Sequence, residues 1–160
     1  TSIHQRLKRE EVGVTFRRIW LYLPLSIFIS FVLALLEYHI TRTDYLIPNL
    51  LPLSLLKLTV IMVFFVGFVE EFIFRSVIQT RLSKIFGAGT AIVLSSTLFA
   101  LMHSGYGISY EIVYTFFIGI LMGYIFYKTK NLPFIVLIHG FLNVFLFGFI
   151  PYLGPRFGLF

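Results

Sequence analysis

The segment FVEEFIFRSVIQTRL, residues 68–82, places three charged side chains inside an apolar part of the chain. It follows LKLTVIMVFFVG without a break, so Glu70, Glu71 and Arg75 are predicted to lie at depth in a membrane helix. Each ionisable group in hydrocarbon costs at least ~2.5–3.5 kcal/mol, and such groups therefore need partners or a water-filled cavity. The segment predicts a functional site. A structural ion pair that holds two helices together is the alternative interpretation.

Helix spacing separates the roles of the two glutamates. Glu71 and Arg75 are four residues apart, so they share one helix face and can pair. Glu70 points about 100° away, and Gly67, one turn earlier, leaves room beside its carboxylate. A carboxylate held by Arg stays ionised and is a poor base, whereas an unpaired one in a low-dielectric cavity binds protons more readily. The spacing therefore indicates Glu70 as the reactive group, with Glu71 and Arg75 in support.

Composition identifies the class of protein. Of the 160 residues, 58% are hydrophobic and 12% are charged, whereas soluble domains contain about 25% charged residues. We therefore predict an integral membrane protein. The net charge of +6 comes from short basic clusters between apolar runs, which indicates membrane topology rather than nucleic-acid binding. The chain contains no cysteine, which excludes a disulfide, a thiolate nucleophile and a cysteine-based metal site.

The hydropathy pattern predicts an all-α fold, a polytopic transmembrane helix bundle of about five spans. The predicted spans are Trp20–Ile40, Leu50–Lys84, Ala91–His103, Glu111–Tyr127 and Phe134–Ile150. The second span exceeds one bilayer crossing and must tilt, project or break near its start. Pro151 and Pro155 are expected to end the last span, and Glu37 is expected to face the headgroups without a role. Residues 1–160 are interpreted as a single membrane domain that begins with a cytoplasmic or interfacial segment, residues 1–18.

The basic residues predict an orientation for these spans. Alternating the spans across the membrane collects nine basic residues on one side and two on the other, which fits the positive-inside rule. The nine are Arg6, Lys8, Arg9, Arg17, Arg18, Arg81, Lys84, Lys128 and Lys130, and the two are Arg42 and Arg156. This distribution predicts a multi-pass protein of the cell membrane with a cytoplasmic N-terminus and an active site that opens toward the cytoplasmic side.

Few other strongly polar side chains occur within the spans. His103 ends the third span, while His139 and Asn143, four residues apart, share one face of the fifth. Counted at 1.5 Å per residue, Glu70, His103 and His139 lie ~16, ~21 and ~14 Å from the cytoplasmic side. Independent structural histidines have no reason to share one depth with a carboxylate. We therefore expect these groups to meet around one pocket.

These residue types suit peptide hydrolysis, which needs an activated water and hydrogen-bond donors for the developing oxyanion. Glu70, helped by His103, could deprotonate the water, and His139 and Asn143 could donate to the oxyanion. The same side chains could instead hold zinc, with Glu70, His103 and His139 as ligands. The chain has no HExxH motif, and an asparagine is a poor fourth ligand. The metal-free interpretation is therefore favoured, and no cofactor is assigned.

Three motifs in order resemble those of a known family. EEFIFR (residues 70–75) matches EExxxR, FALMH (99–103) matches FxxxH, and HGFLN (139–143) matches HxxxN. On membrane helices this set resembles the CPBP family of intramembrane proteases, which includes type II CAAX prenyl endopeptidases and bacteriocin-processing or abortive-infection members. The similarity covers roughly residues 60–147. Ser76 stands where members commonly have glycine, which indicates a packing change.

The resemblance implies a polytopic intramembrane endopeptidase that cleaves membrane-anchored substrates within the lipid bilayer, some of them prenylated CAAX-type tails. It implies that Glu70 and His103 activate the water and that His139 and Asn143 stabilise the oxyanion. Both glutamate-protease and metalloprotease labels are used for the family. The resemblance does not select one substrate or an oligomeric state for this chain.

Other function classes stay open on the sequence. A non-catalytic membrane binding or immunity protein of the same fold would depend on Gly119 and Gly123, whose GxxxG spacing lets membrane helices approach closely. A proton or ion transporter would use the buried carboxylate and the histidines as a relay, although the chain shows no repeated half-helices. A serine hydrolase would use Ser96 or Ser104, but no acid is placed to orient His103.

Overall fold

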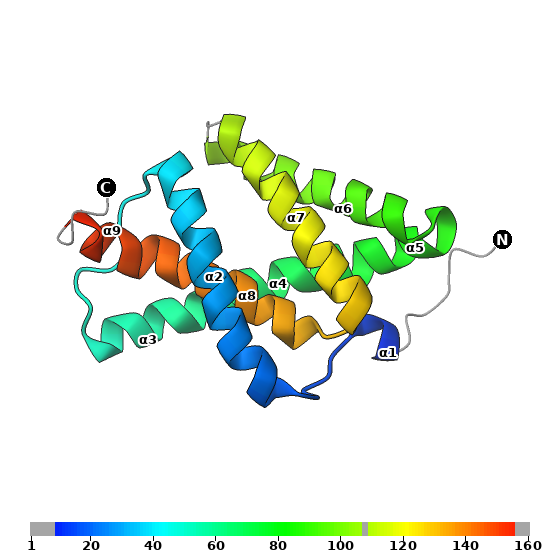
Figure 1. The fold of residues 1–160 in the computed structure, drawn as a ribbon, viewed down its shortest axis with the longest axis horizontal. Helices are drawn as coiled ribbons and strands as arrows, with labels where there is room; N and C mark the ends of the chain where they lie inside the picture. The colour runs from blue at the N-terminus through cyan, green and yellow to red at the C-terminus, as the bar shows by residue number, and fades with distance from the viewer. Residues whose placement is uncertain (1–8, 107–108, 156–160) are drawn as a thin grey trace.

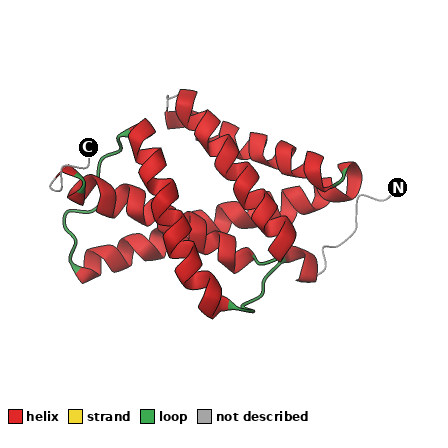
Figure 2. Ribbon diagram, viewed as in Figure 1, coloured by secondary structure: helices red, strands yellow, loops and turns green. Residues whose placement is uncertain are grey.

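The described part of the chain is built from helices and contains no strand (Figures 1 and 2). The computed structural model describes residues 9–106 and 109–155. Within them, five helices are long and apolar enough to cross a membrane. They are α2 (Ile19–Thr41), a composite helix Pro52–Phe86, α6 with the turn after it (Ala88–Gly105), α7 (Ser109–Thr129) and a second composite helix Leu132–Leu153. The protein is an integral membrane protein, and the predicted fold class, a polytopic α-helical bundle, is confirmed.

The first composite helix runs without interruption through five consecutive segments. They are α3 (Pro52–Val60), η1 (Ile61–Gly67), α4 (Phe68–Glu71), η2 (Phe72–Gln79) and α5 (Thr80–Phe86), of which η1 and η2 are π-helical. Pro52 occupies the first turn, where a missing backbone N–H costs nothing. At 1.5 Å per residue the helix is about 50 Å long, and the hydrocarbon core is about 30 Å thick. The helix does not break near its start, so it must tilt or project beyond the membrane.

The second composite helix is longer than predicted. It comprises α8 (Leu132–Val144), the π-helical η4 (Phe145–Phe149) and α9 (Ile150–Leu153). The expectation that Pro151 ends the helix is wrong, because α9 includes this residue. Proline has no N–H to donate to the carbonyl four residues earlier, that of Phe147. The backbone N–H of Leu46 donates to this carbonyl at 2.8 Å instead, so the helix continues with its acceptor satisfied.

Helix α8 lies at the centre of the bundle. In the most apolar window of its composite helix 67% of the residues are buried inside the protein, against 17% for α2. Helix α2 crosses α8 in Figure 1, and the Ser30 hydroxyl donates to the backbone oxygen of Ile138 at 2.6 Å. Helix α7 pairs with α6 (Ala88–Met102) beside them. Side chains on α8 can therefore meet groups from several other helices.

The predicted GxxxG face of α7 packs closely against its neighbours. A Cβ atom built on Gly119 would lie 2.9 Å from the Ser96 Cβ of α6. One built on Gly123 would lie 2.8 Å from the Gln79 Oε1. Both glycines therefore permit the close approach of α7 that their spacing predicts.

The described residues before α2 are bound to the bundle. Helix α1 (Arg9–Val12) packs against η2, where the Ser76 hydroxyl donates to the Val12 carbonyl at 2.6 Å. The Leu132 N–H donates to the Gly13 carbonyl at 2.8 Å. Ser76 thus contributes one of the hydrogen bonds between the bundle and the N-terminal segment.

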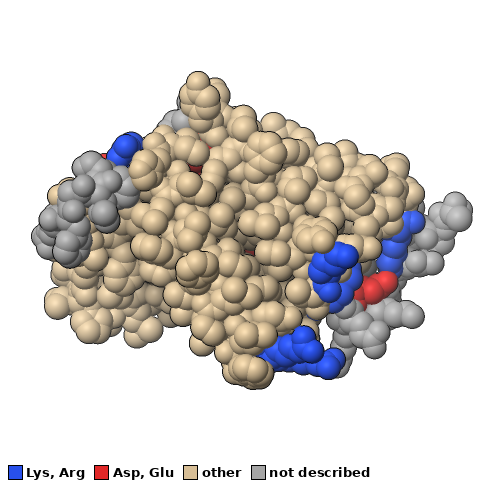
Figure 3. Space-filling view, in the orientation of Figure 1, with Lys and Arg blue, Asp and Glu red and all other residues tan. Residues whose placement is uncertain are grey.

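Many large hydrophobic side chains are exposed on the outer surface, and most of the Lys and Arg on the face drawn in Figure 3 lie toward one end. Phe28, Phe64 and Phe117 are each more than 60% exposed, as lipid-facing side chains would be. At the basic end the Lys84 ammonium binds the Glu11 carboxylate at 2.7 Å. Burial lowers the pKa of Lys130, an effect that the Glu11 charge opposes.

This gathering agrees with the predicted sidedness of the basic residues in the described part of the chain. Three of the basic residues on which that prediction rests lie outside the described residues: Arg6, Lys8 and Arg156.

Candidate active site

The two adjacent glutamates lie on α4, between the π-helical segments η1 and η2. Such widened turns are frequent at functional sites, because they rotate side chains away from ordinary helical positions. Glu71 is completely buried, whereas Glu70 retains 22% side-chain exposure. The two neighbours therefore occupy different environments, as the helix spacing predicts.

Glu71 is bound on both of its carboxylate oxygens. The Arg75 Nε donates to Oε2 at 3.0 Å, so the predicted pair is confirmed. The His139 Nδ1 lies 2.9 Å from Oε1. Because a carboxylate held by a guanidinium accepts but does not donate, His139 must carry its proton on Nδ1. Glu71 therefore fixes the orientation and the tautomer of His139.

Phe99 packs at the centre of these charged groups. Its ring is 2% exposed, and its centroid lies 4.8 Å from the Arg75 guanidinium carbon. Its ring centroid also lies 4.8 Å from that of His103 and 5.8 Å from that of His139. The Arg75 Nη1 and Nη2 atoms have no hydrogen-bond partner among the described residues. The aromatic face of Phe99 supplies a favourable surface for this guanidinium and separates the two histidines.

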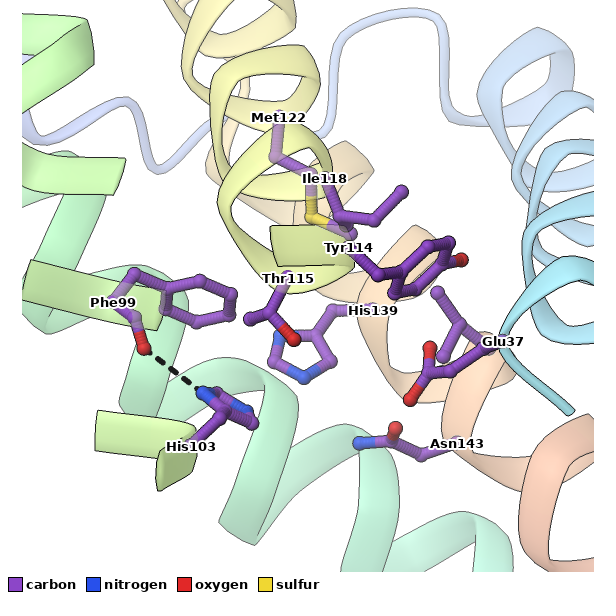
Figure 4. Close-up of a pocket in the computed structure, with 10 residues that line it drawn as sticks. Glu37, Phe99, His103, Tyr114, Thr115, Ile118, Met122, His139 and Asn143 are labelled. Atoms are coloured by element: carbon purple, nitrogen blue, oxygen red, sulfur yellow. Dashed lines mark hydrogen bonds between the residues drawn. The ribbon is translucent and has the colours of Figure 1, made fainter. Parts of the chain in front are cut away.

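Glu70 faces His103 across a short gap. The Glu70 Oε2 lies 3.9 Å from the His103 Nε2 and receives no hydrogen bond from the described residues. The His103 Nδ1 lies 2.9 Å from the Phe99 carbonyl oxygen, which can only accept, so Nδ1 carries a proton (Figure 4). In the neutral ring Nε2 is then an acceptor. A separation of 3.9 Å is too long for a direct hydrogen bond and leaves room for one bridging water.

Two cavities join these groups. The small cavity, of about 30 Å³, is lined by Phe99, His103, His139, Asn143 and Glu37 among others (Figure 4). The large cavity, of about 300 Å³, is lined by Glu70 together with His103, His139 and Asn143. The four side chains that the sequence analysis selected thus line one common space, although 73 residues separate the first from the last.

Two further carboxyl groups reach this space, and the sequence analysis assigned a role to neither. The expectation that Glu37 faces the headgroups is wrong: it is half-buried and lines both cavities (Figure 4). Glu111 is 2% exposed and lines the large cavity. In both cases the helical spacing could have predicted that the side chain points into the bundle. Glu37 continues the buried stripe of Ser30 and Leu33 on α2, and Glu111 lies eight residues before Gly119 on the packed face of α7.

The alternative residue sets fit the geometry less well. Within residues 9–106 and 109–155 there is no group of three His, Asp or Glu side chains that could hold a metal ion. Glu70, His103 and His139 therefore do not fit a zinc site. The Ser96 hydroxyl has no hydrogen-bond partner among the described residues and packs at the Gly119 position. It is not paired with a histidine as a serine nucleophile requires.

Comparison with known proteins gives one family. The family model described as type II CAAX prenyl endopeptidase Rce1-like matches residues 52–145, which is more than half of the chain. Neither the curated proteins nor the solved structures gave a match. The matched range contains all three motifs on which the sequence resemblance rests, and that resemblance is confirmed. The chain belongs to the Rce1-like family of type II CAAX prenyl endopeptidases, which are CAAX-type intramembrane endopeptidases.

Proposed function

We propose that this protein hydrolyses a peptide bond of a membrane-anchored substrate with a water molecule activated by Glu70 and His103. One observation supports this most strongly: the 3.9 Å separation between the Glu70 Oε2 and the His103 Nε2 at the wall of the large cavity. Both atoms accept hydrogen bonds when Glu70 is ionised and His103 is neutral. A water between them would donate one proton to each and direct its lone pair into the cavity. Proton transfer to this pair would make the water a nucleophile, and the same proton would pass to the leaving amine nitrogen when the C–N bond breaks.

His139 and Asn143 are proposed to stabilise the oxyanion that forms when the water attacks the carbonyl carbon. The Asn143 carboxamide can donate in any protonation state. His139 donates from Nε2 only as an imidazolium, because Glu71 already receives its Nδ1 proton. The Glu71 carboxylate stabilises that positive charge at 2.9 Å. Donors held in place in a low-dielectric site stabilise developing negative charge effectively.

The large cavity suits a membrane-anchored peptide as the substrate. Its lining combines the polar groups with an apolar wall that includes Met62, Val66, Leu146 and Phe147. A peptide attached to a lipid could therefore place its scissile amide beside Glu70 and its apolar part along this wall. Prenylated CAAX-type tails belong to this substrate class. Thr41, Thr43 and Leu46, which also line this cavity, lie at the end of α2 that carries Arg42, opposite the basic end of the bundle, so the basic residues do not support an opening of this cavity toward the cytoplasmic side.

The experiment measures cleavage of a farnesylated CAAX peptide by the purified protein in lipid nanodiscs. Glu70→Gln and His103→Asn are each expected to lower kcat by about 10²–10⁴-fold, as for loss of a general base. Glu11→Gln and His39→Asn are the matched controls, because neither residue lines the two catalytic cavities. Cleavage is expected to persist in a metal chelator. The mechanism would be contradicted if Glu70→Gln and His103→Asn kept the wild-type kcat. It would also be contradicted if activity were lost completely in chelator and recovered on adding zinc.

A further inference from the structure

The carboxyl groups of Glu37 and Glu111 form a pair at the wall of the large cavity. They come from different helices, α2 and α7, and both line this cavity. Oε1 of Glu111 accepts a hydrogen bond from the Thr115 hydroxyl at 3.2 Å. Oε2 is buried and has no donor among the described residues. Two carboxylates that line one cavity repel each other unless a proton or another cation lies between them.

The charge lining the large cavity is one-sided. Glu37, Glu70 and Glu111 line it, while none of its lining residues in the described part of the chain is a lysine or an arginine. Arg75, the nearest guanidinium in the sequence motif, is completely buried against Glu71 and Phe99 and is not part of the lining. The cavity therefore offers acceptors for a cation, and the positive charge proposed for His139 in its wall is balanced by Glu71.

The pair is placed where a bound substrate would reach it. Glu37 shares both cavities with His139 and Asn143, the proposed oxyanion donors, and Glu111 shares the large one. Since one liquid water occupies about 30 Å³, a cavity of about 300 Å³ has room for a long side chain in addition to the scissile amide. A substrate side chain that entered it would bring its tip to the wall formed by α2 and α7.

We infer that Glu37 and Glu111 are specificity-determining residues that bind the ammonium or guanidinium of a lysine or arginine of the substrate near the scissile bond. This inference rests on the proposed peptidase function and adds to it the charge of the preferred peptide. A lysine ammonium donates three hydrogen bonds, and Glu111 Oε2 and the Glu37 carboxylate both accept. The cation would also remove the repulsion between the two carboxylates.

The test compares membrane-anchored peptides that carry one lysine at each of three positions on either side of the scissile bond. Each has a counterpart with norleucine, which keeps the methylene chain and lacks the ammonium. At one or more positions the wild type is expected to prefer lysine at least about tenfold in kcat/KM, as for a charge-assisted hydrogen bond. In Glu37→Gln, Glu111→Gln and the double variant this ratio is expected to fall toward one. Glu11→Gln, outside the cavity, is expected to keep it.

A binding measurement separates this inference from the proposed mechanism. The same peptides, fluorescently labelled, are titrated onto Glu70→Gln, and the lysine peptide is expected to bind about tenfold more tightly than its norleucine counterpart. If no peptide is cleaved but this preference is present and is lost on adding Glu37→Gln, the inference holds and the peptidase mechanism fails. Equal binding and cleavage of every lysine and norleucine pair by wild type would mean that the carboxyl pair holds a proton only. That result overturns the inference, as does a preference that the double variant keeps.

Discussion

Glu71 and His139 are 68 residues apart in the chain, and their side chains meet at 2.9 Å inside the bundle. The same carboxylate binds Arg75 through its other oxygen at 3.0 Å. One buried charge thus orients a proposed catalytic ring and neutralises a guanidinium. It links the motif on the first composite helix to the motif on α8.

Glu71→Gln is expected to lower both stability and activity. The neutral amide leaves Arg75 as an unpaired buried charge, a change that costs about 3–5 kcal/mol in buried ion pairs. It also removes the negative charge that stabilises the His139 imidazolium, although the amide oxygen can still accept from Nδ1. We therefore expect a larger change in kcat than in KM. Thermal unfolding in detergent micelles and steady-state kinetics measure the two effects. Glu70→Gln is the control, because it should lose activity at an unchanged melting temperature. A Glu71→Gln protein with wild-type melting and kcat would exclude this role.

Gly140→Ala is expected to separate α8 from η1. A Cβ atom on Gly140 would lie 2.7 Å from the Val63 Cα, and a backbone atom cannot move aside as a side-chain tip can. Overpacking of this kind costs about 1–3 kcal/mol, and activity should fall because His139 is the preceding residue. Gly89→Ala is the matched control, since a Cβ there has nothing within 4 Å. Equal melting temperatures for the two variants would show that α8 and η1 tolerate separation.

Phe99→Leu is expected to lower kcat strongly and to lower the free energy of unfolding less than Glu71→Gln does. Leucine fills most of the volume but lacks the π-face that lies 4.8 Å from the Arg75 guanidinium carbon. Loss of a desolvated cation–π contact is worth about 2 kcal/mol. The ring also separates His103 from His139. Phe117→Leu, on the exposed side of α7, is the control in the same cleavage and unfolding measurements. An unaltered kcat in Phe99→Leu would show that the ring does not position these groups.

Ser76→Ala is expected to weaken the attachment of the N-terminal segment. It removes the 2.6 Å hydrogen bond to the Val12 carbonyl, which corresponds to about 1 kcal/mol. Proteolysis between residues 9 and 18 in nanodiscs should therefore become faster. Thr97→Ala is the control, because the Thr97 hydroxyl bonds a carbonyl of its own helix, that of Val93, on an exposed face. Equal cleavage rates in the two variants would mean that Ser76 does not hold the segment.

Local rules predicted much of the fold and part of the site. Long apolar runs predict membrane helices because a backbone in lipid must satisfy its own hydrogen bonds, and the observed spans follow the predicted ones within a few residues, except where α9 includes Pro151. The pair Glu71–Arg75 follows from a four-residue spacing on one helix. Counting residues along the helices also placed Glu70, His103 and His139 at a common depth, and they line one cavity. Their catalytic roles stay predictions.

The sequence by itself determined which segments span the membrane and which charged groups pair along one helix, because both depend on residues within a few turns. Only the tertiary structure decided that Glu71 orients His139, that the Leu46 N–H binds the Phe147 carbonyl four residues before Pro151, and that Glu37 and Glu111 line one cavity beside the proposed site. Each of these contacts joins side chains or backbone groups of different helices and loops. Such contacts depend on how α2, α7 and α8 cross, and crossing geometry is set by packing between surfaces rather than by the spacing of residues along any one helix.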